Sequence, residues 1–312
     1  VNIIMHHAVL VDKVVEHLIQ DSSGIYLDVT CGFGGHTEAI LEKLNSEGRV
    51  IAIDQDQDAI NFTKNKFVNE DRVTVVKGKF GDLKQTLGLH DSDFQCSGIL
   101  ADLGVSSFQL DNAERGFSFQ KEGPLDMRMD QSNGINAQIW VNTASENEIS
   151  QVLWKFGEEN FSRKIAKAII NCRINNQIIT TKQLSEIVME AKKSEKTKSR
   201  KHLATKTFQA IRIYINQELD QLKQLLDFSL YGLKIGGRLC IISFHSLEDR
   251  IVKRFFRNQS RVDPNLLKLP NLPEQDLPKL KIITKRIKSS NEEIEFNPRS
   301  RSAILRVVEK IR

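Results

Sequence analysis

The sequence lacks any apolar run of the roughly 18 residues that a membrane-spanning helix needs, which argues against a membrane protein. The first residues, VNIIMHHAVL, also lack the basic stretch, the apolar stretch and the small-residue cleavage site of a secretory signal. We therefore expect a cytoplasmic protein with no membrane partner.

Cysteine is scarce, and none of the four cysteines belongs to a C-x-x-C pair. They are Cys31, Cys96, Cys172 and Cys240. Such scattered thiols argue against a structural zinc site and against a disulfide framework. This pattern predicts a protein of the reducing cytoplasm without a bound metal.

Neither sign of charge is in large excess, because 45 Lys and Arg stand against 40 Asp and Glu, for a formal net charge of +5. Hydrophobic residues make up 40% of the 312 and charged residues 27%, as in ordinary globular proteins. The length suffices for one large domain or two ordinary ones. The modest positive charge permits a nucleic-acid partner without requiring one.

The first third of the chain alternates between strand and helix patterns. Short apolar runs at 24–30, 49–54, 73–76 and 98–103 read as strands, and stretches with helical spacing separate them. Strands that alternate with helices indicate βαβ units and a parallel sheet. The predicted fold class is therefore α/β, with a Rossmann-like sheet.

This alternation stops after the fourth strand and resumes only at 237–244. We interpret 1–109 and 206–312 as one α/β domain, and 110–205 as a helical domain inserted into it. Apolar residues between Phe208 and Leu226 recur every three or four positions, which predicts one long helix leading back to the sheet. Residues 281–287 and 302–310 read as two final antiparallel strands at the sheet edge.

A glycine-rich loop follows the first strand, in the sequence DVTCGFGGH that begins at Asp28. Glycines there allow a tight turn and a close approach of a cofactor to the backbone. Asp54 ends the second strand 54 − 32 = 22 residues after Gly32, where a carboxylate can accept hydrogen bonds from ribose hydroxyls. The loop and the acid together predict a nucleotide-like cofactor.

Two details favour S-adenosyl-L-methionine over a dinucleotide. Asp28 lies just before the glycines, where it would repel a pyrophosphate but can meet the amino-acid end of S-adenosyl-L-methionine through the loop backbone or a water. The chain also ends in predicted antiparallel strands instead of another βα unit. Position 37, where the third glycine of a dinucleotide fingerprint would fall, is Thr37. A structural role for Asp28, and a capping or packing role for His36, remain open alternatives.

Further candidate residues follow the later strands. Phe80 comes after the third strand, as an adenine wall or as ordinary core. Asp102 ends the apolar fourth strand, at the sheet edge where α/β proteins bind ligands, so a site role is favoured over packing. After the fifth strand, His245 is a candidate for base or phosphate binding or for proton relay, or it caps the following helix alongside Ser246, whose Ser-Leu-Glu-Asp sequence fits a capping box.

A basic run, Lys192–Lys206, stands where the insert returns to the sheet, with Lys198, Arg200 and Lys201 at its centre. Runs of this kind are either solvated loops or contacts for nucleic-acid phosphates. Both interpretations remain open from the residues alone.

With these residues assembled, the chain resembles the MraW (RsmH) family of small-subunit ribosomal RNA cytosine-N4 methyltransferases. The shared motifs extend along nearly the whole chain: His6-His-Ala-Val-Leu10, Asp28…Gly34-Gly35-His36, Asp54-Gln-Asp56, Asp102-Leu-Gly-Val-Ser-Ser107, Arg115-Gly-Phe-Ser-Phe119, Gly123-Pro-Leu-Asp-Met-Arg-Met-Asp130, Phe156-Gly-Glu-Glu159, Thr205-Lys-Thr-Phe-Gln-Ala210, Ser243-Phe-His-Ser-Leu-Glu-Asp-Arg250 and Asn297-Pro-Arg-Ser-Arg-Ser302. The departures are Ala8, Phe33, Phe108, Leu203 and Lys206, and none removes a proposed contact.

The resemblance implies methylation of one cytidine in the decoding region of 16S rRNA of the small ribosomal subunit, with S-adenosyl-L-methionine as cofactor. The family's cofactor contacts carry over to Gly34, Gly35, His36, Asp54, Phe80, Asp102 and Gln109. Asp102 is the best-placed acceptor for the target amine or for the cofactor's amino group. The rivals are an NAD-dependent oxidoreductase on a Rossmann sheet and a non-catalytic RNA-binding assembly factor.

Overall fold

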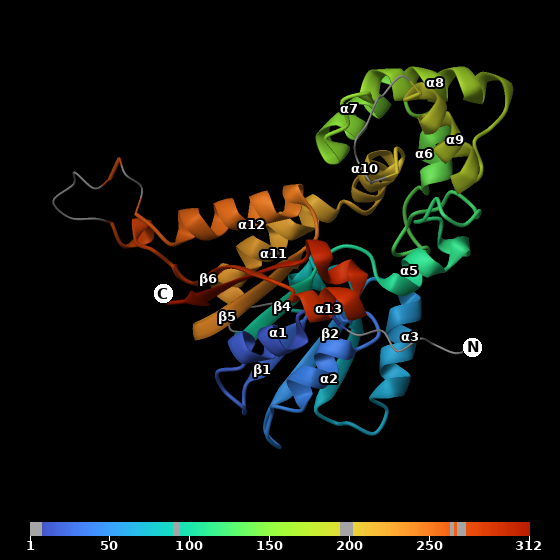
Figure 1. Cartoon of the computed structure of the whole chain (residues 1–312). Helices are drawn as coiled ribbons and strands as arrows, with labels where there is room; N and C mark the ends of the chain where they lie inside the picture. The colour runs from blue at the N-terminus through green and yellow to red at the C-terminus, as the bar shows by residue number, and fades with distance from the viewer. Residues whose placement is uncertain (1–7, 90–93, 194–201, 263–264, 267–272) are drawn as a thin grey trace. The chain divides into compact units, whose positions relative to one another are not determined.

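The computed structural model describes residues 8–89, 94–193, 202–262, 265–266 and 273–312 (Figure 1). His6 and His7 of the first family motif lie outside these ranges. The chain divides into two compact units, which we call the sheet unit (Val1–Gly104 with Leu219–Arg312) and the helical unit (Val105–Glu218). The helical unit thus begins at 105 instead of the expected 110, and ends at 218 instead of 205.

The sheet unit contains one seven-stranded sheet with the order β3-β2-β1-β4-β5-β7-β6. The strands are β1 (Ile25–Asp28), β2 (Arg49–Asp54), β3 (Val73–Lys77), β4 (Cys96–Asp102), β5 (Leu233–Ser243), β6 (Leu280–Lys288) and β7 (Ile304–Lys310). The first five are parallel, and β7 pairs antiparallel with both β5 and β6. The expected parallel sheet and its antiparallel edge are confirmed.

Helices cover both faces of this sheet (Figure 1). They are α1 (Val11–Leu18), α2 (Gly35–Leu41), α3 (Gln57–Lys66), α4 (Leu83–Thr86), α11 (Glu218–Gly232), α12 (Ser246–Gln259) and α13 (Asn291–Phe296), with 3-10 turns at Glu274–Asp276 and Pro298–Ser302. Neighbouring strand residues face opposite cores, as the two-residue period of a strand requires. Leu27 packs with the core of α11 and α12, whereas Tyr26 packs with that of α1 and α2.

The helical unit contains α5 (Ser107–Asp111), α6 (Ala137–Thr143), α7 (Glu146–Gly157), α8 (Ser162–Asn175), α9 (Thr181–Ala191) and α10 (Thr205–Asn216), with a 3-10 turn at Ala113–Arg115. Its core includes the buried Trp140, Leu153 and Phe208. The segment 115–130 precedes α6 and is rich in charged residues. The buried Arg115 holds it in place, because its Nη2 donates to the carbonyl oxygens of Arg128 and Met129.

The single long helix expected between Phe208 and Leu226 is wrong. The chain forms two helices, α10 and α11, because Gln217 adopts a left-handed φ of 54° that interrupts the helix. Asn216 at the end of α10 bonds to backbone groups of the 127–129 segment, at 2.8 Å to the Met127 oxygen and 2.7 Å from the Met129 nitrogen. The apolar period continues through the break, so the sequence pattern alone does not reveal it.

Candidate active site at the carboxyl edge of the sheet

The glycine loop joins β1 to α2, at the point in the sheet where the chain runs to β2 and β3 on one side and to β4 and β5 on the other. Such switch points are where open α/β sheets form ligand crevices. Gly32 and Gly34 have φ of 50° and 74°, which residues with a Cβ rarely adopt. A Cβ on Gly32 would meet no atom within 4 Å, so the loop leaves room beside its backbone.

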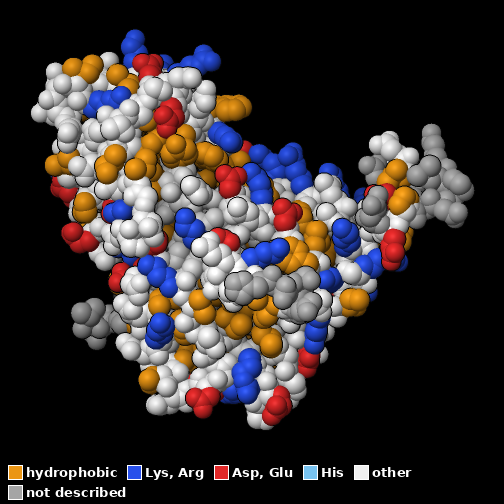
Figure 2. Space-filling view, turned by 180° about the vertical axis from the view of Figure 1, so that it is seen from behind, with side chains coloured by type: hydrophobic (Ala, Val, Ile, Leu, Met, Phe, Trp, Pro, Cys, Tyr) orange, Lys and Arg blue, Asp and Glu red, His pale blue; other side chains and the backbone are white. Residues whose placement is uncertain are grey.

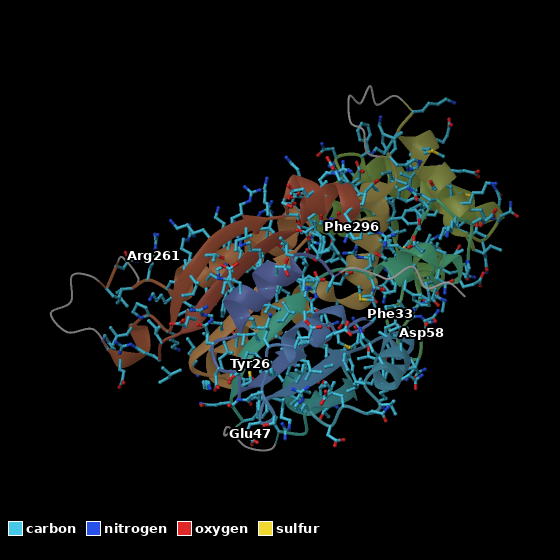
Figure 3. The ribbon with its side chains drawn as sticks, turned by 60° about the horizontal axis from the view of Figure 1, so that its bottom comes forward. Tyr26, Phe33, Glu47, Asp58, Arg261 and Phe296 are labelled. Atoms are coloured by element: carbon cyan, nitrogen blue, oxygen red, sulfur yellow. The ribbon has the colours of Figure 1, made fainter. Side chains whose placement is uncertain are left out.

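Phe33 of this loop packs edge-on against Phe62 of α3, with the ring centroids 4.7 Å apart. Figure 3 labels Phe33 of the loop and Asp58 of α3. The aromatic contact accounts for an apolar residue at a loop position where the family often has arginine. Two other residues of α3 also hold the loop, because the Thr63 hydroxyl donates to the Gly32 oxygen at 2.8 Å and Lys66 Nζ donates to the Gly34 oxygen at 3.4 Å.

Asp54 ends β2 and holds the glycine loop in place. Its Oδ2 accepts the Gly32 N–H at 2.9 Å, and its Oδ1 accepts the Asp56 N–H at 2.9 Å. Burial raises the pKa of Asp54 to about 6. The nearby carboxylates of Asp56 and Asp28 also raise this pKa, whereas the two backbone hydrogen bonds lower it. Each carboxylate oxygen can accept a further hydrogen bond, so the group can still bind a ribose hydroxyl.

Asp28 is fully buried and is bonded within the fold. Its Oδ2 accepts the Thr37 hydroxyl at 2.7 Å, and its Oδ1 accepts the Thr30 N–H at 3.4 Å. Burial raises its pKa to about 6. These contacts match the structural alternative for Asp28, in which the carboxylate ties β1 to the start of α2.

Asp102 lies at the end of β4, the neighbour of β1. Its backbone N–H donates to the Thr30 hydroxyl at 2.7 Å, a contact that the sequence analysis did not foresee. The side chain is 22% exposed, yet its Oδ1 is buried and has no hydrogen-bond partner among the described residues. Burial raises the pKa of Asp102 to about 7, and Asp28 and Glu248 raise it further while His36 lowers it.

His36 links Asp102 to the segment before α1. Its Nε2 lies 2.9 Å from the Val9 carbonyl oxygen, and its Nδ1 lies 3.8 Å from Asp102 Oδ2. The ring is buried in the first turn of α2, and Gly34, not His36, is the N-cap residue of that helix. His36 therefore does not cap α2, and its buried imidazole lies beside the carboxylate of Asp102.

Phe80 and Gln109, two further predicted cofactor contacts, both have structural roles within the fold. Phe80 is 8% exposed and belongs to the core cluster that contains Ile53 and Leu103. Gln109 belongs to the helical unit, where it forms a reciprocal capping box with Ser106 at the start of α5. A cofactor contact at either residue stays a prediction.

The capping box after β5 belongs to His245, and the expectation that Ser246 provides it is wrong. His245 Nδ1 accepts the Glu248 N–H at 3.4 Å, and Glu248 Oε2 accepts the His245 N–H at 3.3 Å. Two capping-box patterns overlap here, one from His245 to Glu248 and one from Ser246 to Asp249. The second would use the Asp249 carboxylate as its acceptor. The Asp249 carboxylate is instead bound by Arg306 at 2.7 and 3.0 Å, so only the first box forms. Base or phosphate binding by His245 and Ser246 stays a prediction.

Lys198, Arg200 and Lys201 lie outside the described residues. The two ends of their basic run are held within the helical unit. Lys192 is buried, and its Nζ donates to Glu159 Oε2 at 2.9 Å and to the Leu203 oxygen at 3.1 Å. Lys192 therefore anchors the run and is not accessible to a ligand.

The site contains no obvious metal ligands. Within the described ranges, no three His, Cys, Asp or Glu side chains are grouped so as to hold a metal ion. The groups that the structure places at this edge are the carboxylates of Asp54 and Asp102, the imidazole of His36 and the backbone of the glycine loop.

No helix in the described part of the chain combines the length and the apolar content that crossing a membrane requires.

Comparison with known proteins matches this architecture to one family along almost the entire chain. A family model described as the MraW methylase family matches residues 3–311. Proteins named ribosomal RNA small subunit methyltransferase H are 46% identical in Coxiella burnetii (98% of this chain, 99% of that protein), 47% in Hydrogenovibrio crunogenus (98% and 96%) and 46% in Idiomarina loihiensis (98% and 97%). Identity at this level and coverage, together with the glycine loop and the acids at its edge, shows that the chain belongs to the MraW methylase family of S-adenosyl-L-methionine-dependent methyltransferases.

Proposed function

We propose that this protein transfers a methyl group from S-adenosyl-L-methionine to the exocyclic N4 of one cytidine in the decoding region of 16S rRNA of the small ribosomal subunit. The names of its relatives support a small-subunit RNA substrate. The observation that carries the proposal is Asp102, whose Oδ1 is buried without a partner among the described residues at the edge of the sheet. An acceptor of this kind suits an amine that must lose a proton. Ribosomal RNA as substrate also implies that the enzyme works in the cytoplasm.

The residues at this edge fit the cofactor. Asp54 retains acceptor capacity for the ribose, and the open space at Gly32 gives room for close backbone approach. The cofactor carries positive charge on its sulfonium and its amino group, and the carboxylates of Asp54 and Asp102 complement that charge. The cofactor supplies the electrophilic methyl group. In the family's pattern Gly34, Gly35, His36, Phe80 and Gln109 complete the contacts.

The protein's own contribution is to orient the target amine and remove its proton. The lone pair of the cytosine amine is delocalised into the ring, which makes the amine a poor nucleophile. Asp102 Oδ1 can accept an N–H of that amine, raise the electron density on nitrogen and hold it in line for transfer. A pKa of about 7 leaves much of the carboxyl group ionised at neutral pH and able to take up the proton.

The helical unit is the proposed RNA-recognition part of the enzyme. Arg163, Lys164 and Lys167 are exposed on α8 at spacings of one and three residues, which places them on one side of that helix. Basic side chains of this kind bind phosphates irrespective of sequence. The target base must be unstacked or single-stranded to reach the edge of a sheet.

Mass spectrometry of the target nucleoside tests the function. Small-subunit RNA from a strain without this gene should lack the methyl group on the decoding-region cytidine, and expression of the wild-type protein should restore it. The Asp102→Asn variant is the control, because it should leave the RNA unmethylated although it is expressed. An unchanged methylation state without the gene would contradict the proposal, and a failure to bind S-adenosyl-L-methionine while binding NAD would favour the oxidoreductase.

A further inference from the structure

One side of α12 in the sheet unit carries a row of exposed basic residues, with Asn258 among them. Arg250, Lys253, Arg254, Arg257 and Arg261 are all exposed, and the steps between them are 3, 1, 3 and 4 residues. Steps of three and four place side chains on the same face of a helix. We call these five residues the basic face of α12. It includes Arg261, two residues beyond the end of the helix, which Figure 3 labels.

The opposite side of α12 fixes the orientation of this face. Val252 and Phe256 are buried in the core between α12 and the sheet, at 0% and 2% exposed. Because these apolar residues hold one side of the helix against β-strands, the basic face is directed to solvent. Figure 2 shows Lys and Arg side chains gathered on the side of the molecule that carries α12.

The acids of α12 form no ion pair with Lys253, Arg254 or Arg257, within the part of the chain that the structure describes. Glu248 caps the first turn and Asp249 binds Arg306. Within the described residues, no salt bridge involves Lys253, Arg254 or Arg257. Like charges at spacings of three and four residues destabilise a helix, so the placement of Lys253, Arg254 and Arg257 has a cost that no ion pair with a described residue offsets.

A neighbouring exposed helix shows that this pattern is not a general property of the sheet unit. α11 carries Asp220 and Asp227 as well as Lys223, and Lys223 pairs with Asp220 at 2.7 Å. Mixed charge of this kind is the ordinary composition of a solvated face. The basic residues on the edge strand β6 are explained by protection of the sheet edge against pairing with another strand.

The basic face begins close to Asp102. β5 pairs with β4 so that Ile242 lies opposite Asp102, and α12 starts four residues after Ile242. The 14 residues of α12 span about 21 Å, which is enough to follow several phosphates of an RNA strand. The helix therefore starts at the edge of the sheet where the target base would be held and runs back along the sheet, so that Gln259 at its end lies beside Lys279 before β6.

We propose that the basic face of α12 binds the phosphate backbone of the RNA substrate and holds the strand that carries the target base. This inference deepens the proposed function and rests on it for the identity of the substrate. It assigns phosphate contacts to the methyltransferase unit itself, in addition to any made by the helical unit. Its chemistry is sequence-independent, so it contributes to affinity and to salt dependence.

A triple charge-removal variant tests the proposal, namely Lys253→Gln with Arg254→Gln and Arg257→Gln. The matched control removes three positive charges elsewhere in the sheet unit, through Lys13→Gln, Lys43→Gln and Lys64→Gln, all at exposed positions. Both variants carry the same net charge, so a general electrostatic effect would weaken them equally. Binding to unmodified 16S rRNA transcript is measured for each across a series of salt concentrations, with thermal unfolding as the check on folding.

The α12 variant should bind RNA about tenfold or more weakly than the control, with a salt slope shallower by about 2, since each lost contact to a single strand removes about 0.7. Affinity for S-adenosyl-L-methionine should be unchanged. Equal affinities and slopes for the two variants would overturn the proposal, as would a wild-type protein that binds no RNA. The readout of this test is RNA binding and not methylation. A wild-type protein that binds RNA without methylating it would therefore contradict the proposed function, while the comparison of the two variants would still test this inference.

Discussion

His36 Nδ1 lies 3.8 Å from Asp102 Oδ2, while Nε2 of the same ring lies 2.9 Å from the Val9 carbonyl oxygen. A carbonyl oxygen can only accept, so Nε2 carries a proton, and this assignment follows from the hydrogen-bond network. A neutral ring would then direct the Nδ1 lone pair at the carboxyl group.

The first prediction concerns the pH dependence of methyl transfer. Burial, Asp28 and Glu248 raise the pKa of Asp102 to about 7, so the carboxyl group ionises as pH rises through neutrality. If the ionised form accepts the amine proton, the single-turnover rate should rise about tenfold per pH unit below 7 and level off above it. A rate that is flat across this range, with saturating RNA and cofactor, would contradict the assignment.

The second prediction concerns His36→Gln. The electrostatic interaction with the His36 imidazole lowers the pKa of Asp102, and glutamine removes that interaction while it retains an N–H donor for the Val9 carbonyl. The midpoint of the pH–rate profile should shift upward by about one unit. An unshifted midpoint, with the maximal rate at high pH merely reduced, would mean that His36 acts only through packing.

The third prediction concerns stability. The pKa of Asp28 is raised to about 6 in the folded state by burial, so the folded protein keeps this proton to a higher pH than the unfolded chain does. The free energy of unfolding should therefore fall as pH rises from about 4 to about 6, by about 3 kcal/mol from this group.

The Asp28→Asn variant, which cannot ionise at this position, tests that slope by chemical denaturation. It should lose this part of the pH dependence even if its unfolding free energy is lower at every pH. Equal slopes for the variant and the wild-type protein would show that Asp28 does not titrate in this window.

The fourth prediction concerns Asp54→Ala. Loss of two ribose hydrogen bonds to a charged acceptor, each worth about 1.5–3 kcal/mol, should weaken S-adenosyl-L-methionine binding measured by calorimetry. The Gly32 N–H also loses its acceptor, so Asp54→Asn, which retains one oxygen, is the matched variant and should bind with intermediate affinity. Wild-type affinity in Asp54→Ala would refute the ribose role.

The sequence predicted the strands well because buried strands and helix faces leave local signatures. The five parallel strands and the antiparallel edge follow from apolar runs of the right length. The helix break at Gln217 has no such signature, since it depends on bonds between Asn216 and the distant 127–129 segment. Periodicity reports which face is buried and not where a backbone dihedral departs from the helix.

The candidate site was predictable in its chain positions and not in its contacts. Asp54 and Asp102 stand at strand ends, which a pattern can locate. Their partners Thr30 and Gly32, like Val9 for His36, come from other segments, and only the folded chain brings them together. Lys192 likewise looks like any basic surface residue until its burial against Glu159 is seen.

The central claim is that Asp102 accepts the proton of the target amine, and the Asp102→Asn variant tests it most directly. Asparagine keeps the size and one acceptor oxygen and removes the charge. With saturating S-adenosyl-L-methionine and RNA, single-turnover methyl transfer should fall by roughly 10²-fold or more, while cofactor affinity changes little. A parallel loss of cofactor affinity and rate would assign the carboxylate to the cofactor's amino group, and wild-type values of both would contradict any role for Asp102 in the site.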